Sequence, residues 1–263
     1  MHNLIKEICK QEDILFESYS KNYVLRLTKN EKIKYIFGAY WDLNSASADR
    51  IACDKCACYT LLKENGVPAI EHELLYNPLI RAGWSDSTWL QAIKYFNTHS
   101  GQVVIKPNQG SSGRDVYYCD SISALETATQ TIFALCPDAA ISPFKHIELE
   151  YRIFYLKGKC LFAYGKTPGE YTWKHNLSEG ATAFEIKNKE HLKKLENLAS
   201  QAAAAIGITF ATIDIAELVT GELIIVEINS GVQARRLVTQ LPQLHQIIKE
   251  IYLTAIKEMF EYD

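Results

Sequence analysis

Two acidic residues and one asparagine are the side chains whose spacing best suits metal chemistry. Asp214 lies in an apolar stretch over residues 210–219, and Glu227 and Asn229 lie in a second one over residues 222–229. Both stretches are rich in Ile, Val and Leu, which predicts two β-strands. A two-residue turn between the strands would place Asp214 opposite Glu227, with Asn229 on the same face because side chains alternate along a strand.

The turn is predicted at Thr220-Gly221, since glycine in a two-residue connection is typical of a hairpin. Two carboxylates that face each other across a strand pair repel unless a cation lies between them. Carboxylate and amide oxygens are the ligands that Mg²⁺ prefers, with Mn²⁺ as an alternative. The competing interpretation is a surface hairpin whose acids point into water, but the apolar neighbours of both acids favour buried strands.

A loop of small residues follows the strand predicted over residues 103–106 and precedes the one over residues 116–119. Small residues let backbone N–H groups approach phosphate closely, and Lys106 adds a positive charge at the start of the loop. A Walker motif is absent, because a strand follows the loop instead of a helix. A plain hairpin loop would explain the same composition. The small residues are Gly110, Ser111, Ser112 and Gly113.

A helix with clear ends is predicted over residues 54–66. Asp54 is a good N-cap and Gly66 a good residue to end the helix. Lys55 then lies in the first turn, where the helix dipole disfavours a cation unless an anion binds nearby. Lys55 is therefore a second candidate for binding phosphate.

Composition excludes several classes of protein. The chain has 263 residues, a net charge of −3 and a pI near 6.2, which gives no electrostatic signature of nucleic-acid binding. No apolar run approaches the ~20 residues needed to cross a bilayer. Seven cysteines in no framework spacing indicate reduced thiols used for packing, and we expect a cytoplasmic protein.

Taken in order, these motifs resemble the ATP-grasp superfamily over roughly residues 50–263. Lys55 and Lys106 resemble its two nucleotide-binding lysines, and the Gly/Ser loop resembles its phosphate-covering loop. Twelve residues separate Asp214 from Glu227 and one separates Glu227 from Asn229, as in D-alanine–D-alanine ligases. The segments around Arg152 and Asn176 look closest to the branch of glutathione synthetase, ribosomal-protein glutamate ligase and cyanophycin synthetase.

The resemblance implies an α+β fold in which two lobes with antiparallel sheets grip ATP between them. We expect a short N-terminal segment over residues 1–50, a small lobe over 51–140 and a large lobe with the metal site over 141–263. The implied site consists of a hinge at Ser142 and Phe144 for adenine, Glu150 for ribose, and Lys174 and Asn176 beside the phosphates. The implied metal ligands are Asp214, Glu227 and Asn229, which would hold two Mg²⁺ ions.

The implied reaction is ATP-dependent ligation of a carboxylate to an amine. The carboxylate attacks the γ-phosphate of ATP, and the amine then displaces phosphate from the acylphosphate to give an amide. Arg152, Arg235 and Arg236 are the candidates to hold the carboxylate or the transferring phosphoryl group. The alternatives are a phosphotransferase that stops at the phosphorylated substrate and a non-catalytic or accessory ATP-binding protein.

Three departures from the family pattern concern the substrate. Lys174 stands where the branch often has arginine, and a lysine cannot form a forked contact. Thr212 stands where related ligases often have arginine. The N-terminal segment is shorter than the usual substrate domain, which favours a homodimer or a partner protein. Besides small carboxylates and amines, an amino acid, a peptide or a protein could be the acceptor.

Overall fold

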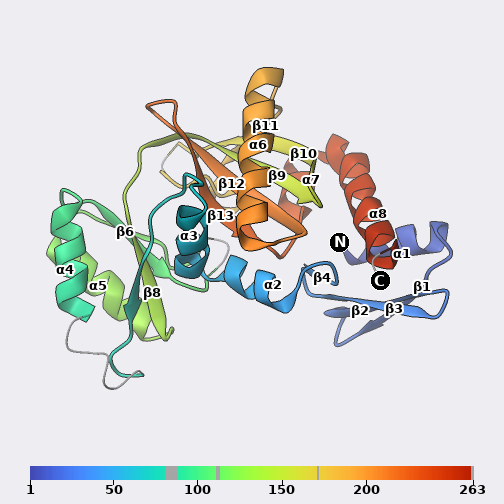
Figure 1. The fold of residues 1–263 in the computed structure, drawn as a ribbon, viewed down its shortest axis with the longest axis horizontal. Helices are drawn as coiled ribbons and strands as arrows, with labels where there is room; N and C mark the ends of the chain where they lie inside the picture. Colours follow the sequence, from blue (N-terminus) through green and yellow to red (C-terminus); the bar gives the residue numbers. More distant parts are fainter. Residues whose placement is uncertain (81–87, 111–112, 171, 262–263) are drawn as a thin grey trace.

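The computed structural model describes residues 1–80, 88–110, 113–170 and 172–261. Three antiparallel sheets with helices packed against them form an α+β fold, as the sequence predicts (Figure 1). No helix among the described residues is long and apolar enough to cross a membrane.

A five-stranded sheet occupies the centre of the chain. Helices cover one of its faces, where Ile153, Ile213 and Ile215 pack against the apolar side of the longest helix. The strand order is β11 (Thr182–Phe184), β10 (Lys159–Thr167), β9 (Ile147–Leu156), β12 (Phe210–Leu218) and β13 (Leu223–Asn229). The covering helices are α2 (Ala46–Cys53), α3 (Lys55–Glu64) and α6 (Lys189–Ile206).

The opposite face of this sheet changes character along its strands. At one end Phe154 and Phe210 are buried against the C-terminal helix and the N-terminal part of the chain. Further along the same two strands, on the same face, stand Arg152 and Asp214. One face therefore supplies both a hydrophobic core and a polar surface.

A four-stranded sheet forms a separate lobe, with helices on one face around a core that includes Leu125 and Ile141. Ser121 caps its second helix by accepting a hydrogen bond from the backbone of Ala124 at 3.2 Å. The strand order is β5 (Glu73–Tyr76), β8 (Asp138–Pro143), β6 (Val103–Pro107) and β7 (Tyr117–Cys119), and the helices are α4 (Thr88–Thr98) and α5 (Ile122–Phe133).

Two chain segments join this lobe to the five-stranded sheet. One passes from Ile70, whose backbone donates to the carbonyl of Ile225 on β13 at 2.9 Å, to the start of β5. The other runs over residues 144–146, between β8 and β9. These segments set the relative position of the two lobes.

The N-terminal part forms its own antiparallel sheet of β1 (Leu15–Tyr19), β2 (Val24–Lys29), β3 (Lys32–Phe37) and β4 (Tyr40–Trp41). Trp41 links this sheet to the central core, with its ring centroid 5.4 Å from Phe210 and 5.2 Å from Tyr252. Two helices cover its inner face: α1 (His2–Gln11), which the sequence does not predict, and α8 (His245–Glu261). The short elements α7 (Arg235–Gln240), η1 (Leu177–Glu179) and η2 (Pro242–Leu244) complete the chain.

Candidate active site

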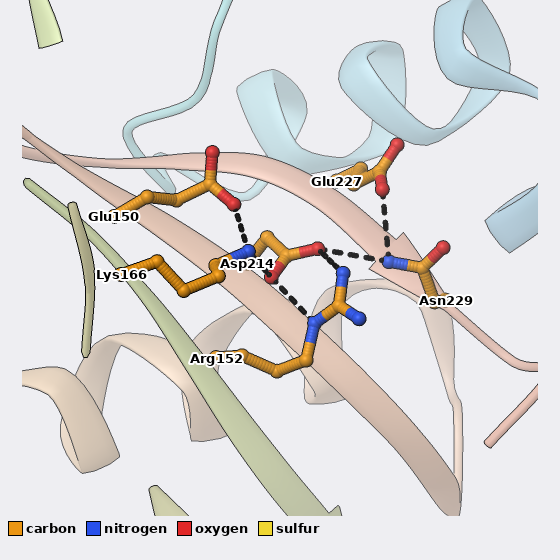
Figure 2. Close-up of polar contacts among 6 residues, drawn as sticks. All are labelled: Glu150, Arg152, Lys166, Asp214, Glu227 and Asn229. Carbon is orange, nitrogen blue, oxygen red and sulfur yellow. Dashed lines mark hydrogen bonds and ion pairs between the residues drawn. The ribbon is translucent and has the colours of Figure 1, made fainter. Parts of the chain in front are cut away.

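Asp214 and Glu227 face each other across β12 and β13, as predicted. Thr212 pairs with Asn229 one step along, so Asn229 lies on the same face. The Asn229 amide nitrogen donates to Asp214 Oδ2 at 3.1 Å and to Glu227 Oε1 at 3.0 Å. Oxygens from two carboxylates therefore converge on one point beside the amide (Figure 2).

The predicted turn between these strands is wrong, although the predicted register at Asp214 is confirmed. The backbone of Leu218 donates to the carbonyl of Glu222 at 2.9 Å, so three residues form the turn instead of two. A β-bulge then restores the register, because Asp214 pairs with Glu227 while Ile215 pairs with Ile225. The extra turn residue and the extra bulge residue, Val226, cancel at the site.

The second predicted hairpin is wrong by one residue at the site. A regular turn at Lys157-Gly158 would place Arg152 opposite Ala163 and Glu150 opposite Gly165. A bulge between Cys160 and Phe162 shifts β10, so that Tyr164 lies opposite Arg152 and Lys166 opposite Glu150. The shift carries Lys166 onto the polar face.

Lys166 is a site residue that the sequence does not predict. Its side chain is 3% exposed and forms ion pairs with Glu150 and, at 3.1 Å, with Asp214 (Figure 2). Only its position near the end of an apolar strand could have drawn attention to it, since a bulge leaves no clear signal in one sequence.

Arg152 does not project freely toward a substrate. Its guanidinium donates from Nε to Asp214 Oδ1 at 2.8 Å and from Nη2 to Asp214 Oδ2 at 2.5 Å, a bidentate pair (Figure 2). Burial alone would raise the pKa of Asp214, but Arg152 and Lys166 hold it well below its ordinary value. Asp214 is therefore ionised at neutral pH.

The remaining charges on this face favour a further cation. Burial raises the pKa of Glu150, and the neighbouring Lys166 opposes that shift. Three carboxylates, of Glu150, Asp214 and Glu227, stand against two cations, of Arg152 and Lys166. The described residues contain no cluster of three or more His, Cys, Asp or Glu suited to a metal. The two acids and one amide that converge here are nevertheless a hard oxygen set that fits Mg²⁺.

A cleft of about 660 Å³ opens over this face and extends to the smaller lobe. Lys55 and Lys106 line it together with Asp214 and Glu227. The ammonium of Lys55, in the first turn of α3, donates to the carbonyl of Gly110 at 2.9 Å, so it ties the helix to the small-residue loop. Burial, and then the nearby charge of Lys55, lower the pKa of Lys106 to about 8.

Two loops meet at the rim of the cleft. Lys174 Nζ lies 3.4 Å from the carbonyl of Gly113, and a Cβ added to Gly113 would lie 2.6 Å from Asn176 Nδ2. The structure therefore brings together Lys174, Asn176, Gly110 and Gly113 from the predicted set. Ser111 and Ser112 lie outside the described residues.

The predicted hinge lies along one wall of the cleft. Ser142 is buried in β8, where its hydroxyl donates to the carbonyl of Val104 at 3.4 Å. The ring of Phe144 lies 4.6 Å from that of Tyr118 and 5.6 Å from that of Trp173. Both hinge residues line the cleft, and so does Ile147 from a small apolar cluster.

Arg235 and Arg236 begin α7 at another part of the cleft wall. Both side chains are exposed, and both line the cleft with Arg152. Of the three predicted arginines, these two project from the helix start, whereas Arg152 pairs with Asp214.

The cysteines support the packing interpretation. All seven are free, and burial raises the pKa of Cys56 and of Cys58 to about 12. Thiols that stay protonated at neutral pH are poor nucleophiles.

Comparison with known proteins identifies relatives of the whole arrangement. Residues 62–251 match a family described as an ATP-grasp domain, the third family of one clade of that superfamily. An uncharacterized protein of Mycoplasma genitalium is 25% identical over 286 aligned positions, covering 99% of this chain and 88% of that protein.

Two solved structures share the fold. D-alanyl-alanine synthetase A from Vibrio cholerae superimposes with a TM-score of 0.68 at 13% identity, covering 98% of this chain and 92% of that one. D-alanine–D-alanine ligase from Bacillus anthracis, complexed with ATP, superimposes with a TM-score of 0.61 at 15% identity, covering 84% and 71%.

Proposed function

Because this chain belongs to the ATP-grasp superfamily, we propose that it is an ATP- and Mg²⁺-dependent carboxylate–amine ligase. It would form an amide bond and release ADP and phosphate. The observation that carries the proposal is the convergence of Asp214, Glu227 and Asn229 on one face of a cleft that Lys55 and Lys106 also line.

In this proposal each part of the cleft contacts one part of the nucleotide. The apolar wall at Ile147 and the hinge at Ser142 and Phe144 take the adenine, and Glu150 takes the ribose. The lysines at 55 and 106, the backbone of the loop over residues 110–113, and the loop with Lys174 and Asn176 surround the phosphates.

Asp214, Glu227 and Asn229 would hold Mg²⁺, which neutralises charge on the β- and γ-phosphates when bound. The chain's own contribution is positioning and the exclusion of water by the two loops that meet at Gly113 and Asn176. A substrate carboxylate attacks the γ-phosphorus and ADP leaves; an amine then attacks the acyl carbon and phosphate leaves. Arg235 and Arg236 would orient the carboxylate.

Small carboxylates and amines, including amino acids and peptides, are the substrates this site would take. The test is mass spectrometry of the purified chain with Mg·ATP and pooled amino acids, dipeptides and polyamines. We expect ADP and a product whose mass is the sum of two components minus water. Formation of AMP would contradict the acylphosphate route, and ADP with a phosphorylated component alone would indicate a phosphotransferase.

Two variants make the assay specific to the site. Glu227→Gln removes one proposed metal ligand and should abolish ADP formation. Glu222→Gln is the matched control, because Glu222 is exposed in the turn of the same hairpin. Equal activity of both variants would overturn the assignment of Glu227.

One observation favours a non-catalytic function as the second candidate. Arg152 and Lys166 already neutralise Asp214, so the proposed metal site is partly satisfied by the chain itself. A chain that binds nucleotide without turnover would bind Mg·ATP tightly and form no ADP with any pool of acceptors.

A further inference from the structure

Exposed apolar side chains gather on the N-terminal sheet. Of the fourteen large hydrophobic residues that are exposed in the described part of the chain, seven lie between positions 15 and 40. Monomeric proteins rarely leave such side chains together in water unless the surface binds something. The seven are Leu15, Tyr19, Tyr23, Ile33, Tyr35, Phe37 and Tyr40.

The strand register places these side chains on one face. Tyr19 pairs with Val24, Val24 with Phe37, and Phe37 with Tyr40, so a row of apolar residues crosses all four strands. The ring of Tyr23 packs edge-on against Phe37 at 4.8 Å. The helices α1 and α8 cover the opposite face, and no described helix covers this one (Figure 1).

Charge on this face is internally paired. Glu17 and Arg26 are the charged residues among the strand positions of the face, and they lie 3.5 Å apart. The hydroxyl of Tyr19 donates to Glu17 at 3.0 Å. Such a surface suits uncharged apolar side chains and peptide groups, and its one cation is already paired, which disfavours a phosphate backbone.

The apolar row ends at the cleft. Tyr40, its last member, lines the cleft, and its hydroxyl lies 3.5 Å from Cys53 Sγ, another lining residue. Next to it, the backbone of Val232 donates to the carbonyl of Ala39 at 3.0 Å. The sheet is thus fixed to the segment that follows Asn229, and the row and the cleft form one continuous surface.

We propose that the outer face of the N-terminal sheet binds an extended polypeptide whose end enters the cleft as substrate. This inference rests on the proposed ligase function and specifies its substrate class as a peptide or protein with apolar side chains. Tyrosine rings supply rigid contact area at low entropic cost, and their hydroxyls hydrogen-bond to peptide groups. A second copy of the chain on this face would instead cover Tyr40 and the cleft entrance.

The test uses a displayed library of random dodecapeptides selected on the full chain. We expect peptides rich in aromatic and aliphatic residues that bind the wild type and bind Phe37→Ser at least tenfold more weakly. Tyr35→Ser, an exposed position on the same strand, should show the same loss if Phe37→Ser fails to fold. Leu90→Ser is the matched control, because Leu90 is 67% exposed on α4 of the other lobe.

Three results would overturn the docking face: no selected peptide binds the wild type, the peptides bind all variants equally, or the wild type is a dimer that Phe37→Ser converts to a monomer. Mg·ATP binding measured on the same proteins separates this inference from the proposed function. Loss of peptide binding with unchanged nucleotide binding supports the face, whereas a wild type that binds peptide but no nucleotide refutes only the ligase.

Discussion

Lys106 is the residue whose protonation should control nucleotide binding. Burial and the charge of Lys55 lower its pKa to about 8, so the free protein loses this positive charge as pH rises through 8. Bound phosphates favour the protonated form, and binding therefore requires proton uptake above that pH.

We expect the affinity for Mg·ATP to fall by up to about tenfold per pH unit above pH 8, measured by calorimetric titration between pH 7 and 9.5. Lys106→Arg is the control, because arginine stays protonated throughout this range. A wild-type affinity that does not change with pH, or an identical decline in Lys106→Arg, would show that another group is responsible.

Residue types and their spacing alone indicated most of this site. Acids and an asparagine at metal-ligand spacing, and two lysines near helix and loop starts, carried enough chemical information to be selected. Lys166 was missed because its role depends on which way a strand residue faces, and one bulged residue reverses that direction. For the same reason the pairing of Arg152 with Asp214 was not predicted.

At the level of elements, helix ends were predictable and strand register was not. Asp54 caps α3 by accepting a hydrogen bond from the backbone of Ala57 at 2.9 Å, and Gly207 ends α6 with a positive φ of 67°. These are local signals. The register on both sides of β9 and β12 depends on bulges, which arise from packing between sheets.

The meeting of the two rim loops gives a prediction for Gly113. Gly113→Ala places a Cβ against Asn176 and strains a backbone with φ of +70°, so the loops must separate. We expect a loss of nucleotide affinity of about 1–2 kcal/mol, roughly fivefold to thirtyfold.

Gly158→Ala is the matched control for that variant. Gly158 has a φ of +83° in the β9–β10 turn, with nothing within 4 Å of an added Cβ, so the substitution adds backbone strain alone. Equal effects of the two variants on nucleotide affinity would mean that strain, and not the contact between the loops, explains the loss.

At the scale of the molecule, the cleft joins two separately folded parts. Its lining includes Val104 and Lys106 from the smaller lobe and Glu150 and Asp214 from the five-stranded sheet. The α+β fold with antiparallel sheets was predicted because motif order resembled one superfamily, and the family match confirms that superfamily. The narrower branch stays a prediction. The helix α1 and the exposed face of the N-terminal sheet carried no motif and were not foreseen.

A ligand that contacts both lobes should stabilise them together. At 100 times its dissociation constant, Mg·ATP should stabilise the folded chain by about 2.7 kcal/mol, which raises Tm by roughly 5–10 °C. Scanning calorimetry should show one transition that moves as a whole. Two transitions, of which nucleotide shifts only one, would mean that the nucleotide contacts a single lobe.

The most direct measurement of the central claim is binding of Mn²⁺, in place of Mg²⁺, followed by electron paramagnetic resonance with a non-hydrolysable ATP analogue. The account predicts tight Mn²⁺ binding in the presence of the analogue, weakened at least about tenfold in Glu227→Gln and unchanged in Glu222→Gln. Mn²⁺ and nucleotide that bind equally well to wild type and Glu227→Gln would contradict a metal site at Asp214, Glu227 and Asn229.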